Sequence, residues 1–237
     1  MNWSDGVEHL EPYIFNVNTP NCSGTGFYIA YSKNPSLCGV ATAAHVVSHS
    51  HYWEDPIRLT HHSSKESVLL HSSDRFIFLN QSADTACIVF PRGKFHLPDS
   101  PLNITPEGKY LKIGNEVGWL GFPSISSGRL CFFSGKISSW VEDNNAYLID
   151  GVAINGVSGG PSFFISEDSL TVIGIVSSYI ANRNMGDTLP GLCVIQDVSP
   201  FREPIQELKT LEEAQQRQIG EDQPLPQSNQ NECNDLE

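Results

Sequence analysis

Short runs of Val, Ile, Phe and Tyr recur along the chain to about residue 197, separated by Gly, Pro, Ser and Asn. Runs of this kind, bounded by turn residues, are typical of β-strands, and their regular recurrence predicts an all-β sandwich or barrel. Helical periodicity is nearly absent from this part of the chain. Six strands are expected in the first half, over residues 13–17, 26–31, 39–43, 68–70, 76–79 and 86–90. Six more are expected in the second half, over residues 117–120, 130–140, 147–149, 162–165, 172–177 and 192–196.

A proline-rich loop over residues 98–106 interrupts this pattern between the two sets of strands. Proline ends strands and favours irregular connections, so the loop is the natural boundary between two folded units. We therefore predict two six-stranded antiparallel β-barrels, the first over residues 1–97 and the second over residues 98–203. A chain of 237 residues is long enough for such a pair.

A different pattern follows the second barrel. Ile205, Leu208 and Leu211 fall at three-residue spacing, which predicts one amphipathic helix over residues 204–220, packed on the second barrel. Residues 221–237 are rich in Gln, Asn, Pro and acidic side chains. Too few of them are apolar to offset the entropy of ordering the segment, so we expect a flexible acidic tail.

Charge narrows the set of functions. The formal net charge is −13 and the chain has no basic run, which argues against a nucleic-acid surface. No apolar run approaches the roughly eighteen residues of a membrane span, and the N-terminus has no basic start followed by an apolar stretch. We therefore expect a cytoplasmic protein without a membrane partner, in which the six cysteines are reduced and mostly buried thiols.

The densest chemical signal lies at residues 156–161, which read Gly-Val-Ser-Gly-Gly-Pro. Glycines on both sides of a serine suit a tight turn in which two backbone N–H groups converge on one point, as an oxyanion hole requires. The hydroxyl of Ser158 is therefore the candidate nucleophile. It needs an imidazole within hydrogen-bond reach to take its proton, and a third group to fix the tautomer of that ring.

The order of the histidines distinguishes two folds that carry such a serine. The same residues match the Gly-x-Ser-x-Gly elbow of α/β-hydrolases, in which the catalytic His follows the Ser along the chain. In this chain all eight histidines precede Ser158. An order of His, then Asp, then Ser agrees with both the histidine positions and the β pattern.

His45 ends a run of small residues, Thr-Ala-Ala at 42–44, that can pack closely behind an active-site ring. This run resembles the histidine motif of trypsin-like peptidases. Residues 24–27, Gly-Thr-Gly-Phe, resemble the opening strand of bacterial high-temperature-requirement-type proteases. With the serine motif, the resemblance covers about residues 10–205 and implies a chymotrypsin-like fold and a serine endopeptidase that acts on proteins or peptides. The printed chain has no room for the PDZ domain of many bacterial relatives, so we expect substrate to be recruited by another route.

The third member of the expected triad is an aspartate. Asp55, Asp74 and Asp84 lie between His45 and the interbarrel loop. Asp84 directly precedes the apolar strand at 85–90 and resembles the aspartate motif of the family, in which a carboxylate at a strand edge is buried against the imidazole. Asp74 also precedes a strand and is the weaker candidate. The expected triad therefore takes its aspartate from Asp84.

Further roles follow from the resemblance alone. It implies that the N–H groups of Gly156 and Ser158 form the oxyanion hole, and that Ser177 lies on the strand that runs beside substrate and supports the aspartate. Secreted digestive members have an Asp directly before the nucleophile, which pairs with a new N-terminal amine, and Val157 cannot form this pair. We therefore hypothesise that the loop over residues 154–160 is disordered or collapsed until a partner binds, which makes activity conditional.

The resemblance also implies a specificity pocket. It places Val152 at the base and gives Ala153 and Gly191 as lining residues. No charged side chain then faces a basic residue of the substrate. We expect small or medium apolar residues on the acyl side of the cut bond.

Two other classes of function fit single features of the chain. One is a zinc site, since imidazole is a common zinc ligand, but no Cys or acidic ligand set at short fixed spacing completes the group of histidines. We therefore expect no metal and no other cofactor. The other is a catalytically silent binding or regulatory module, whose groove holds a partner without cutting it. The acidic tail and the C-terminal helix are the expected surfaces for a protein partner, whether it activates an enzyme or is held by a silent module. The histidines of the zinc hypothesis are His49, His51, His61, His62 and His71.

Overall fold

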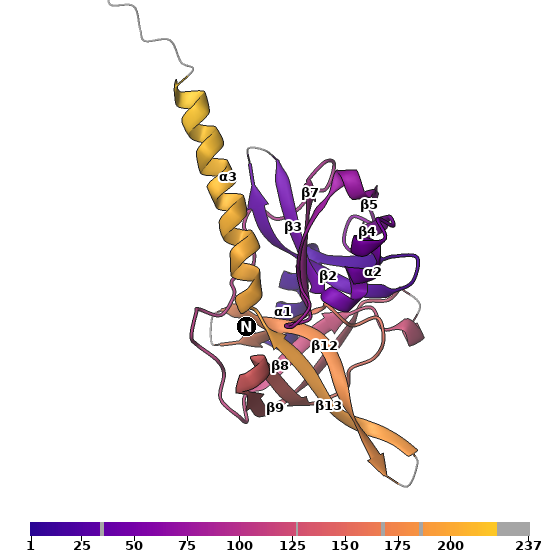
Figure 1. Cartoon of the computed structure of the whole chain (residues 1–237). Helices are drawn as coiled ribbons and strands as arrows, with labels where there is room; N and C mark the ends of the chain where they lie inside the picture. Colours follow the sequence, from indigo (N-terminus) through magenta and orange to yellow (C-terminus); the bar gives the residue numbers. More distant parts are fainter. Residues whose placement is uncertain (34–35, 127, 167–168, 185–186, 222–237) are drawn as a thin grey trace, which may run out of the picture.

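Seven antiparallel strands form one sheet in the N-terminal half, drawn in indigo to purple in Figure 1. The computed structural model describes residues 1–33, 36–126, 128–166, 169–184 and 187–221. The strand order in this sheet is β5-β4-β1-β2-β3-β7-β6. The strands are β1 Ile14–Asn18, β2 Ser23–Ser32, β3 Leu37–Ala43, β4 Ile57–His61, β5 Ser67–Leu70, β6 Phe76–Asn80 and β7 Thr85–Pro91.

Six antiparallel strands form a closed barrel in the C-terminal half, in the order β10-β13-β12-β11-β8-β9. The barrel lies directly against the first sheet, and the ends of β12 and β13 project from it as a two-stranded ribbon (Figure 1). The strands are β8 Glu116–Gly121, β9 Cys131–Val141, β10 Ala146–Asp150, β11 Pro161–Ile165, β12 Leu170–Asn184 and β13 Asp187–Asp197.

The all-β architecture and the second six-stranded barrel are confirmed. The first half differs from the predicted six-stranded barrel. It has seven strands, and its described strand pairs form a half-barrel sheet. The additional strand is β4, which buries Ile57 and Leu59 and exposes Arg58, an alternation hidden in a segment rich in His and Ser. The predicted boundary between residues 97 and 98 lies in the long connection between β7 and β8 and stays a prediction. Residues 222–237 of the expected tail lie outside the described residues.

Two helices occur in the first half that the sequence pattern did not predict. Helix α1, Trp3–Leu10, begins with a capping box in which the side chain of Asn2 accepts the backbone N–H of Asp5 and the Asp5 carboxylate accepts that of Asn2. Gly6 lets this helix approach the second barrel, since a Cβ at this position would come within 2.6 Å of the Ile165 side chain. Helix α2, Ala44–Tyr52, follows β3 directly.

Helix α3, Arg202–Glu221, confirms the predicted C-terminal helix, but its predicted packing on the second barrel is wrong. The helix contacts β2 and β3 of the first sheet and extends beyond them (Figure 1). A Cβ at Gly39 on β3 would lie 3.0 Å from the sulfur of Cys87, 3.2 Å from the Ala30 side chain and 3.7 Å from Leu208, so the glycine leaves room for Leu208 to dock. The small residues of the first sheet therefore decide where the apolar face of α3 docks.

Two apolar cores hold the molecule together. The larger core is continuous across the two halves, because Phe27 and Val40 of the first sheet belong to the same cluster as Phe163 and Ile175 of the barrel. The smaller core fills the closed barrel around the fully buried ring of Trp119. Within the described part of the chain, no helix has both the length and the apolar character needed to cross a bilayer.

The docking of α3 gives a test of the fold. Leu208 is 2% exposed, whereas Leu211, one turn further on, is 47% exposed. We expect Leu208→Ala to lower the free energy of unfolding by about 2–4 kcal/mol, because it removes buried methyl groups and leaves a cavity. The matched control Leu211→Ala should change it by about 0.5 kcal/mol or less. Denaturant unfolding measures both, and equal effects of the two variants would contradict this packing.

Candidate active site

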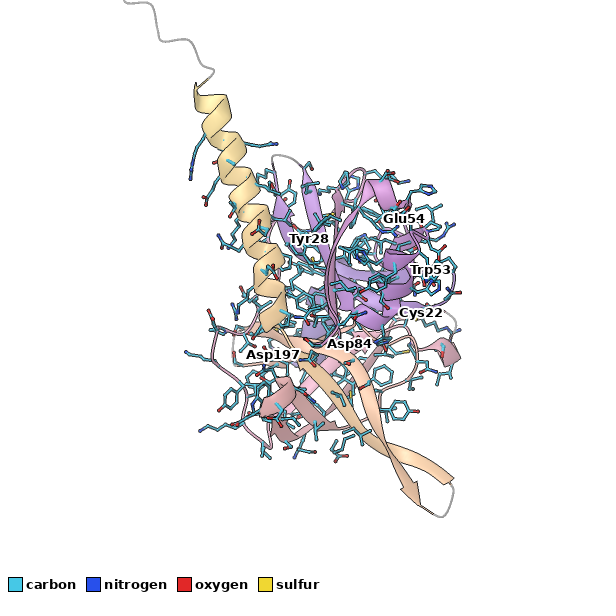
Figure 2. The ribbon with its side chains drawn as sticks, in the orientation of Figure 1. Cys22, Tyr28, Trp53, Glu54, Asp84 and Asp197 are labelled. Carbon is cyan, nitrogen blue, oxygen red and sulfur yellow. The ribbon has the colours of Figure 1, made fainter. Side chains whose placement is uncertain are left out.

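His45 stands at the start of α2, at the junction of the two halves, where Figure 2 labels Asp84. Ala43, the residue before this helix, has no side chain that can cap it, and Asp84 supplies the missing acceptors. The backbone carbonyl of Asp84 accepts the N–H of Ala44 at 3.0 Å, and its Oδ1 accepts the N–H of His45 at 3.0 Å. The carboxylate also suits the positive end of the helix dipole.

The same carboxylate holds the imidazole ring of His45. Nδ1 of the ring lies 3.0 Å from Oδ1 and 2.9 Å from Oδ2 of Asp84. Ser177, on β12 of the other half, donates its hydroxyl to Oδ2 at 2.5 Å. Burial acts to raise the pKa of Asp84, but the hydrogen bonds from His45 and Ser177 outweigh it and leave the pKa below the ordinary value. Asp84 is therefore held as a carboxylate.

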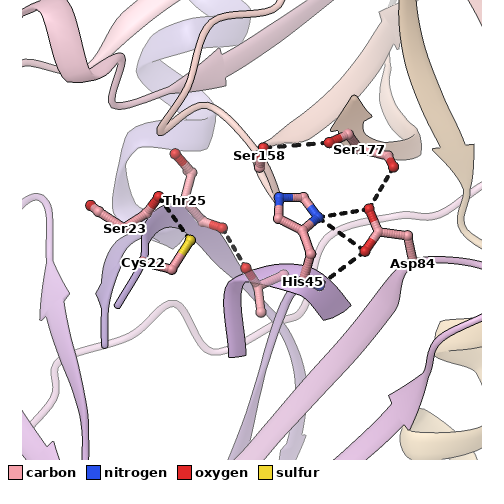
Figure 3. A network of polar contacts seen from close by, with 8 residues as sticks. Cys22, Ser23, Thr25, His45, Asp84, Ser158 and Ser177 are labelled. Carbon is pink, nitrogen blue, oxygen red and sulfur yellow. Dashed lines mark hydrogen bonds and ion pairs between the residues drawn. The ribbon is translucent and has the colours of Figure 1, made fainter. Parts of the chain in front are cut away.

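Ser158 lies in the same cavity as His45. Figure 3 shows the Ser158 side chain on the side of the ring that is turned away from Asp84. Its hydroxyl donates to the carbonyl oxygen of Ser177 at 3.4 Å. Among the described contacts, no hydrogen bond joins the Ser158 hydroxyl to His45. The structure thus brings the three expected residues together, with the bond between serine and histidine not formed.

The turn before Ser158 presents two free backbone donors. Three carbonyl groups of this turn are held from behind: Asn155 O accepts the N–H of Ser124, Gly156 O accepts the hydroxyl of Thr25, and Ser158 O accepts the N–H of Thr25, each at 2.8 Å. The N–H groups of Gly156 and Ser158 have no acceptor among the described residues. Gly156 has φ +92°, a conformation that side chains disfavour. The two donors are therefore free within the described chain, and their role as an oxyanion hole stays a prediction.

Thr25 is the residue of this site that the sequence analysis missed. Besides its two bonds to the turn, its hydroxyl accepts the N–H of Phe122 at 3.0 Å, and its carbonyl accepts the hydroxyl of Thr42 at 2.7 Å. Thr25 is fully buried. The Gly-Thr-Gly-Phe motif marked this segment, but only the fold shows that its hydroxyl reaches a residue 131 positions away in the sequence.

Val157 lies in the barrel core and is fully buried. It packs closely against Gly121, where a Cβ would come within 2.7 Å of its side chain. Apolar packing thus holds the position at which the digestive enzymes carry an aspartate. Within the loop over residues 154–160, the N–H of Val157 donates to the carbonyl of Ile154 at 3.0 Å and that of Gly160 to the carbonyl of Val157 at 2.9 Å, and its dependence on a partner stays a prediction.

The cavity beside the nucleophile has a volume of about 290 Å³, and two of the four expected pocket residues line it, Ala153 and Ser177. Val152 and Gly191 are not among its described lining residues. Val152 is 48% exposed, and a Cβ at the neighbouring Gly151 would come within 2.4 Å of the Trp119 ring. The lining residues are His45, Ala153, Ile154, Asn155, Ser158, Val176, Ser177, Ser178 and Tyr179.

The other histidines make separate contacts. Nδ1 of His49 lies 3.2 Å from Asp55, and the buried ring of His61 contacts the carbonyl of Pro12 at 2.8 Å. His71 begins a short 3-10 turn, where its backbone N–H is accepted by Asp74. No group of three or more His, Cys, Asp or Glu residues suitable for a metal ion occurs in the described part of the chain. The structure thus brings together no set of ligands for the zinc hypothesis.

The ionised state of Asp84 can be tested by pH. Because its pKa is lower in the folded than in the unfolded protein, the carboxylate stabilises the fold above the unfolded pKa, and this stabilisation is lost as the pH falls through the folded pKa. We expect the difference in free energy of unfolding between wild type and Asp84→Asn to shrink as the pH falls from about 5 to about 3. Urea denaturation at a series of pH values measures it. The control is Asp143→Asn, at an exposed site, and a constant difference for Asp84→Asn would contradict the assignment.

Comparison with solved structures places this fold among known proteins. The chain is similar to Rv3671c from M. tuberculosis H37Rv, a mutant in its inactive form, with 20% identity, 92% of each chain covered and a TM-score of 0.57. The active form of the same protease gives 20% identity, 85% of this chain and 83% of that chain covered, and a TM-score of 0.61. The serine endoprotease from Yersinia pestis gives 15% identity, 88% and 66% covered, and a TM-score of 0.64. No protein-family model and no curated protein matches the sequence. The chain therefore has the trypsin-like, two-barrel fold of these serine proteases.

Proposed function

We propose that this chain is a serine endopeptidase that hydrolyses peptide bonds of protein substrates through Ser158, His45 and Asp84. One observation carries the proposal: Asp84 holds Nδ1 of His45 at hydrogen-bond distance, while Ser158 shares the cavity of this ring. The free N–H groups beside Ser158 add the electrostatic component that acyl transfer needs. The fold of the similar serine proteases supports the same reaction class.

The geometry defines the role of each group. Nδ1–H of His45 donates to Asp84, so Nε2 is the proton acceptor. The Ser158 hydroxyl turns from the Ser177 carbonyl to Nε2 and gives up its proton as its oxygen bonds to the carbonyl carbon of the substrate. The resulting imidazolium, stabilised by Asp84, protonates the leaving amine, and the acyl group stays on Ser158. Water then gives a proton to Nε2 as its oxygen bonds to the acyl carbon, and the imidazolium returns that proton to the Ser158 oxygen as the ester bond breaks and the acid product leaves.

The tetrahedral intermediate places a negative charge on the former carbonyl oxygen. The N–H groups of Gly156 and Ser158 donate to no acceptor within the described chain, so both are free to donate to this oxygen. Donors of this kind contribute roughly 3 kcal/mol each to the stability of the transition state, and the contributions do not add. No cofactor takes part in this sequence of steps.

The cavity suits a small or medium apolar side chain on the acyl side of the cut bond. Ala153 and Ile154 give it apolar walls, and no acidic side chain is among its described lining residues. A basic side chain would find no partner there. Ala153 and Ser177 are the proposed contacts with substrate, whereas Val152 and Gly191 lie outside this lining.

A reducing compartment fits the thiols, and we propose the cytoplasm. The five described cysteines are all free. Cys38 is buried, and burial raises its pKa to about 12, so it is held as an unreactive thiol. Cys193 is also buried, and burial raises its pKa to about 12 as well.

The second candidate function is a binding or regulatory module that holds a partner without cutting it. The observation that favours it is the bond from the Ser158 hydroxyl to Ser177 in place of a bond to His45. In a conditionally active enzyme, a protein partner or the substrate would shift this hydroxyl to the ring. The switch would then act on the serine side chain, since the donors at Gly156 and Ser158 are already free.

Labelling of the nucleophile distinguishes the two functions. We expect a fluorophosphonate probe to form one adduct, mapped by mass spectrometry to Ser158, and Ser158→Ala to lose both labelling and peptide hydrolysis with its thermal stability unchanged. The control Ser134→Ala, at an exposed position on β9, should keep both the labelling by the probe and the hydrolysis of peptides. Peptide turnover by Ser158→Ala would remove this residue from the mechanism. Absence of labelling in wild type, with or without a peptide substrate, would favour the silent module.

Removal of the Thr25 hydroxyl tests how the oxyanion donors are positioned. Thr25→Val keeps the shape but leaves Gly156 O without its donor and Phe122 N–H without its acceptor. We expect kcat to fall about tenfold or more with KM little changed. Displaced donors would stabilise the transition state less, whereas the binding of the substrate does not depend on them.

Thr25→Ser keeps the hydroxyl and is the matched control, expected to retain kcat within about twofold. Unfolding of both variants is measured as well, because the unpaired buried groups of Thr25→Val cost about 1–3 kcal/mol of stability. The assay is run well below the unfolding transition of both variants. Equal kcat values for the Val and Ser variants would exclude a positioning role for this hydroxyl.

A further inference from the structure

A second cavity, with a volume of about 340 Å³, lies next to the turn over residues 155–158, called the oxyanion turn below. Its walls come from both halves of the molecule: β1, the start of β2, and β4 with the turn that follows it on one side, and the loop after β8 on the other. None of the residues that line the cavity of His45 lines this one. The triad therefore does not use it.

Two contacts place this cavity relative to the nucleophile. Ser124, which lines it, donates its N–H to the carbonyl of Asn155, and Asn155 lines the cavity of His45. Ser23, which also lines it, precedes Gly24, where a Cβ would lie 3.0 Å from the carbonyl oxygen of Ser158. The turn from Asn155 to Ser158 thus separates the two cavities.

The two cavities could hold the parts of one substrate chain that lie on either side of the cut bond. An extended peptide whose acyl part lies against Ala153 and Ser177 must continue past the Gly156 donor once it reaches the nucleophile. The second cavity borders the same turn through Ser124 and shares no lining residue with the acyl-side cavity. It is therefore placed to receive a side chain from the leaving part of the substrate.

The chemistry of the second cavity differs from that of the first. Lys65 brings a positive charge to its lining, and no carboxylate is among the described residues that line it. Nζ of Lys65 lies 3.4 Å from Nδ1 of His62 and forms no ion pair within the described chain. The neighbouring Glu66 is turned elsewhere, toward the Ser64 hydroxyl at 3.2 Å and toward His96 at 3.8 Å.

Other hydrogen-bonding side chains line the same cavity. Asn16, Asn18 and Thr60 line the cavity together with Lys65, and Pro123 and Phe122 form its apolar side. The chain as a whole carries a net charge of −13, so a cavity with a single unpaired cation is a local exception. A cation flanked by amides and a hydroxyl is suited to a carboxylate.

We propose that this cavity binds an Asp or Glu side chain of the substrate on the leaving-group side of the cut bond, and that Lys65 pairs with the carboxylate. This inference rests on the proposed peptidase function, since it assigns a substrate preference to the same site. Lys65 is a specificity-determining residue and not a catalytic one.

The test is a set of peptides with one fixed acyl part and either Glu or Gln at the first, second or third position after the cut bond. We expect Glu to raise kcat/KM about fivefold over Gln at one of these positions, as a partly exposed ion pair worth about 1 kcal/mol would give. In Lys65→Gln the ratio should fall to about one, while hydrolysis of the Gln peptide is unchanged. Lys65→Arg should restore part of the preference.

Arg58→Gln is the matched control, because Arg58 is an exposed cation on β4 that does not line the cavity, and this variant should keep the wild-type ratio. Equal hydrolysis of the Glu and Gln peptides at all three positions would overturn the proposal, and so would a preference that Lys65→Gln leaves intact. Failure of the proposed function has a separate signature, since the Gln peptides would then not be cut at all by wild type, or would still be cut by Ser158→Ala.

Discussion

The site depends on one carboxylate that three distant parts of the chain share. Asp84 caps the first turn of α2 with its carbonyl and its carboxylate, holds the ring of His45, and accepts the hydroxyl of Ser177 from the other half of the molecule. Burial works against its charge, and the hydrogen bonds more than offset this cost. The helix start and the ring thus use the same residue as acceptor, so a change at Asp84 affects both.

Thr25 is the counterpart of Asp84 for the oxyanion turn. Both residues come from the first half and reach the second, one to fix the imidazole and the other to fix the backbone around Ser158. The apolar core that runs across both halves supplies most of the attraction between them, since burial of apolar surface is the dominant favourable term in folding. The polar contacts at the junction therefore set alignment more than stability, as the proposed reaction between the two halves requires.

The strand pattern and the local motifs were readable from the sequence because they depend on near neighbours. The alternation of apolar residues gave most strands, and the residue types around Ser158 and His45 gave the chemistry. Helix α2 was not readable, since its start is stabilised by Asp84, 39 residues away in the sequence, and not by a cap of its own. The role of Thr25 depends on a contact across 131 residues. The assignment of Val152 and Gly191 to the pocket stays a prediction, because spacing along the chain does not show which side chains line a cavity formed by distant segments.

The position of the Ser158 hydroxyl connects substrate binding to its activation under the proposed function. At 3.4 Å its bond to the Ser177 carbonyl is long and therefore weak, so rotation of one side chain toward His45 costs little. The hydrogen-bonded ladder between β11 and β12 ends at Ile175. Beyond it, the carbonyl of Val176 accepts the N–H of Gly159, and the N–H of Val176 donates to the carbonyl of Gly160. The carbonyl of Ser177 is thus the first on this edge of β12 that an added strand can use. A substrate that donates an N–H to it competes with the serine hydroxyl for this carbonyl, and the imidazole of His45 in the same cavity is the acceptor that the proposed mechanism requires.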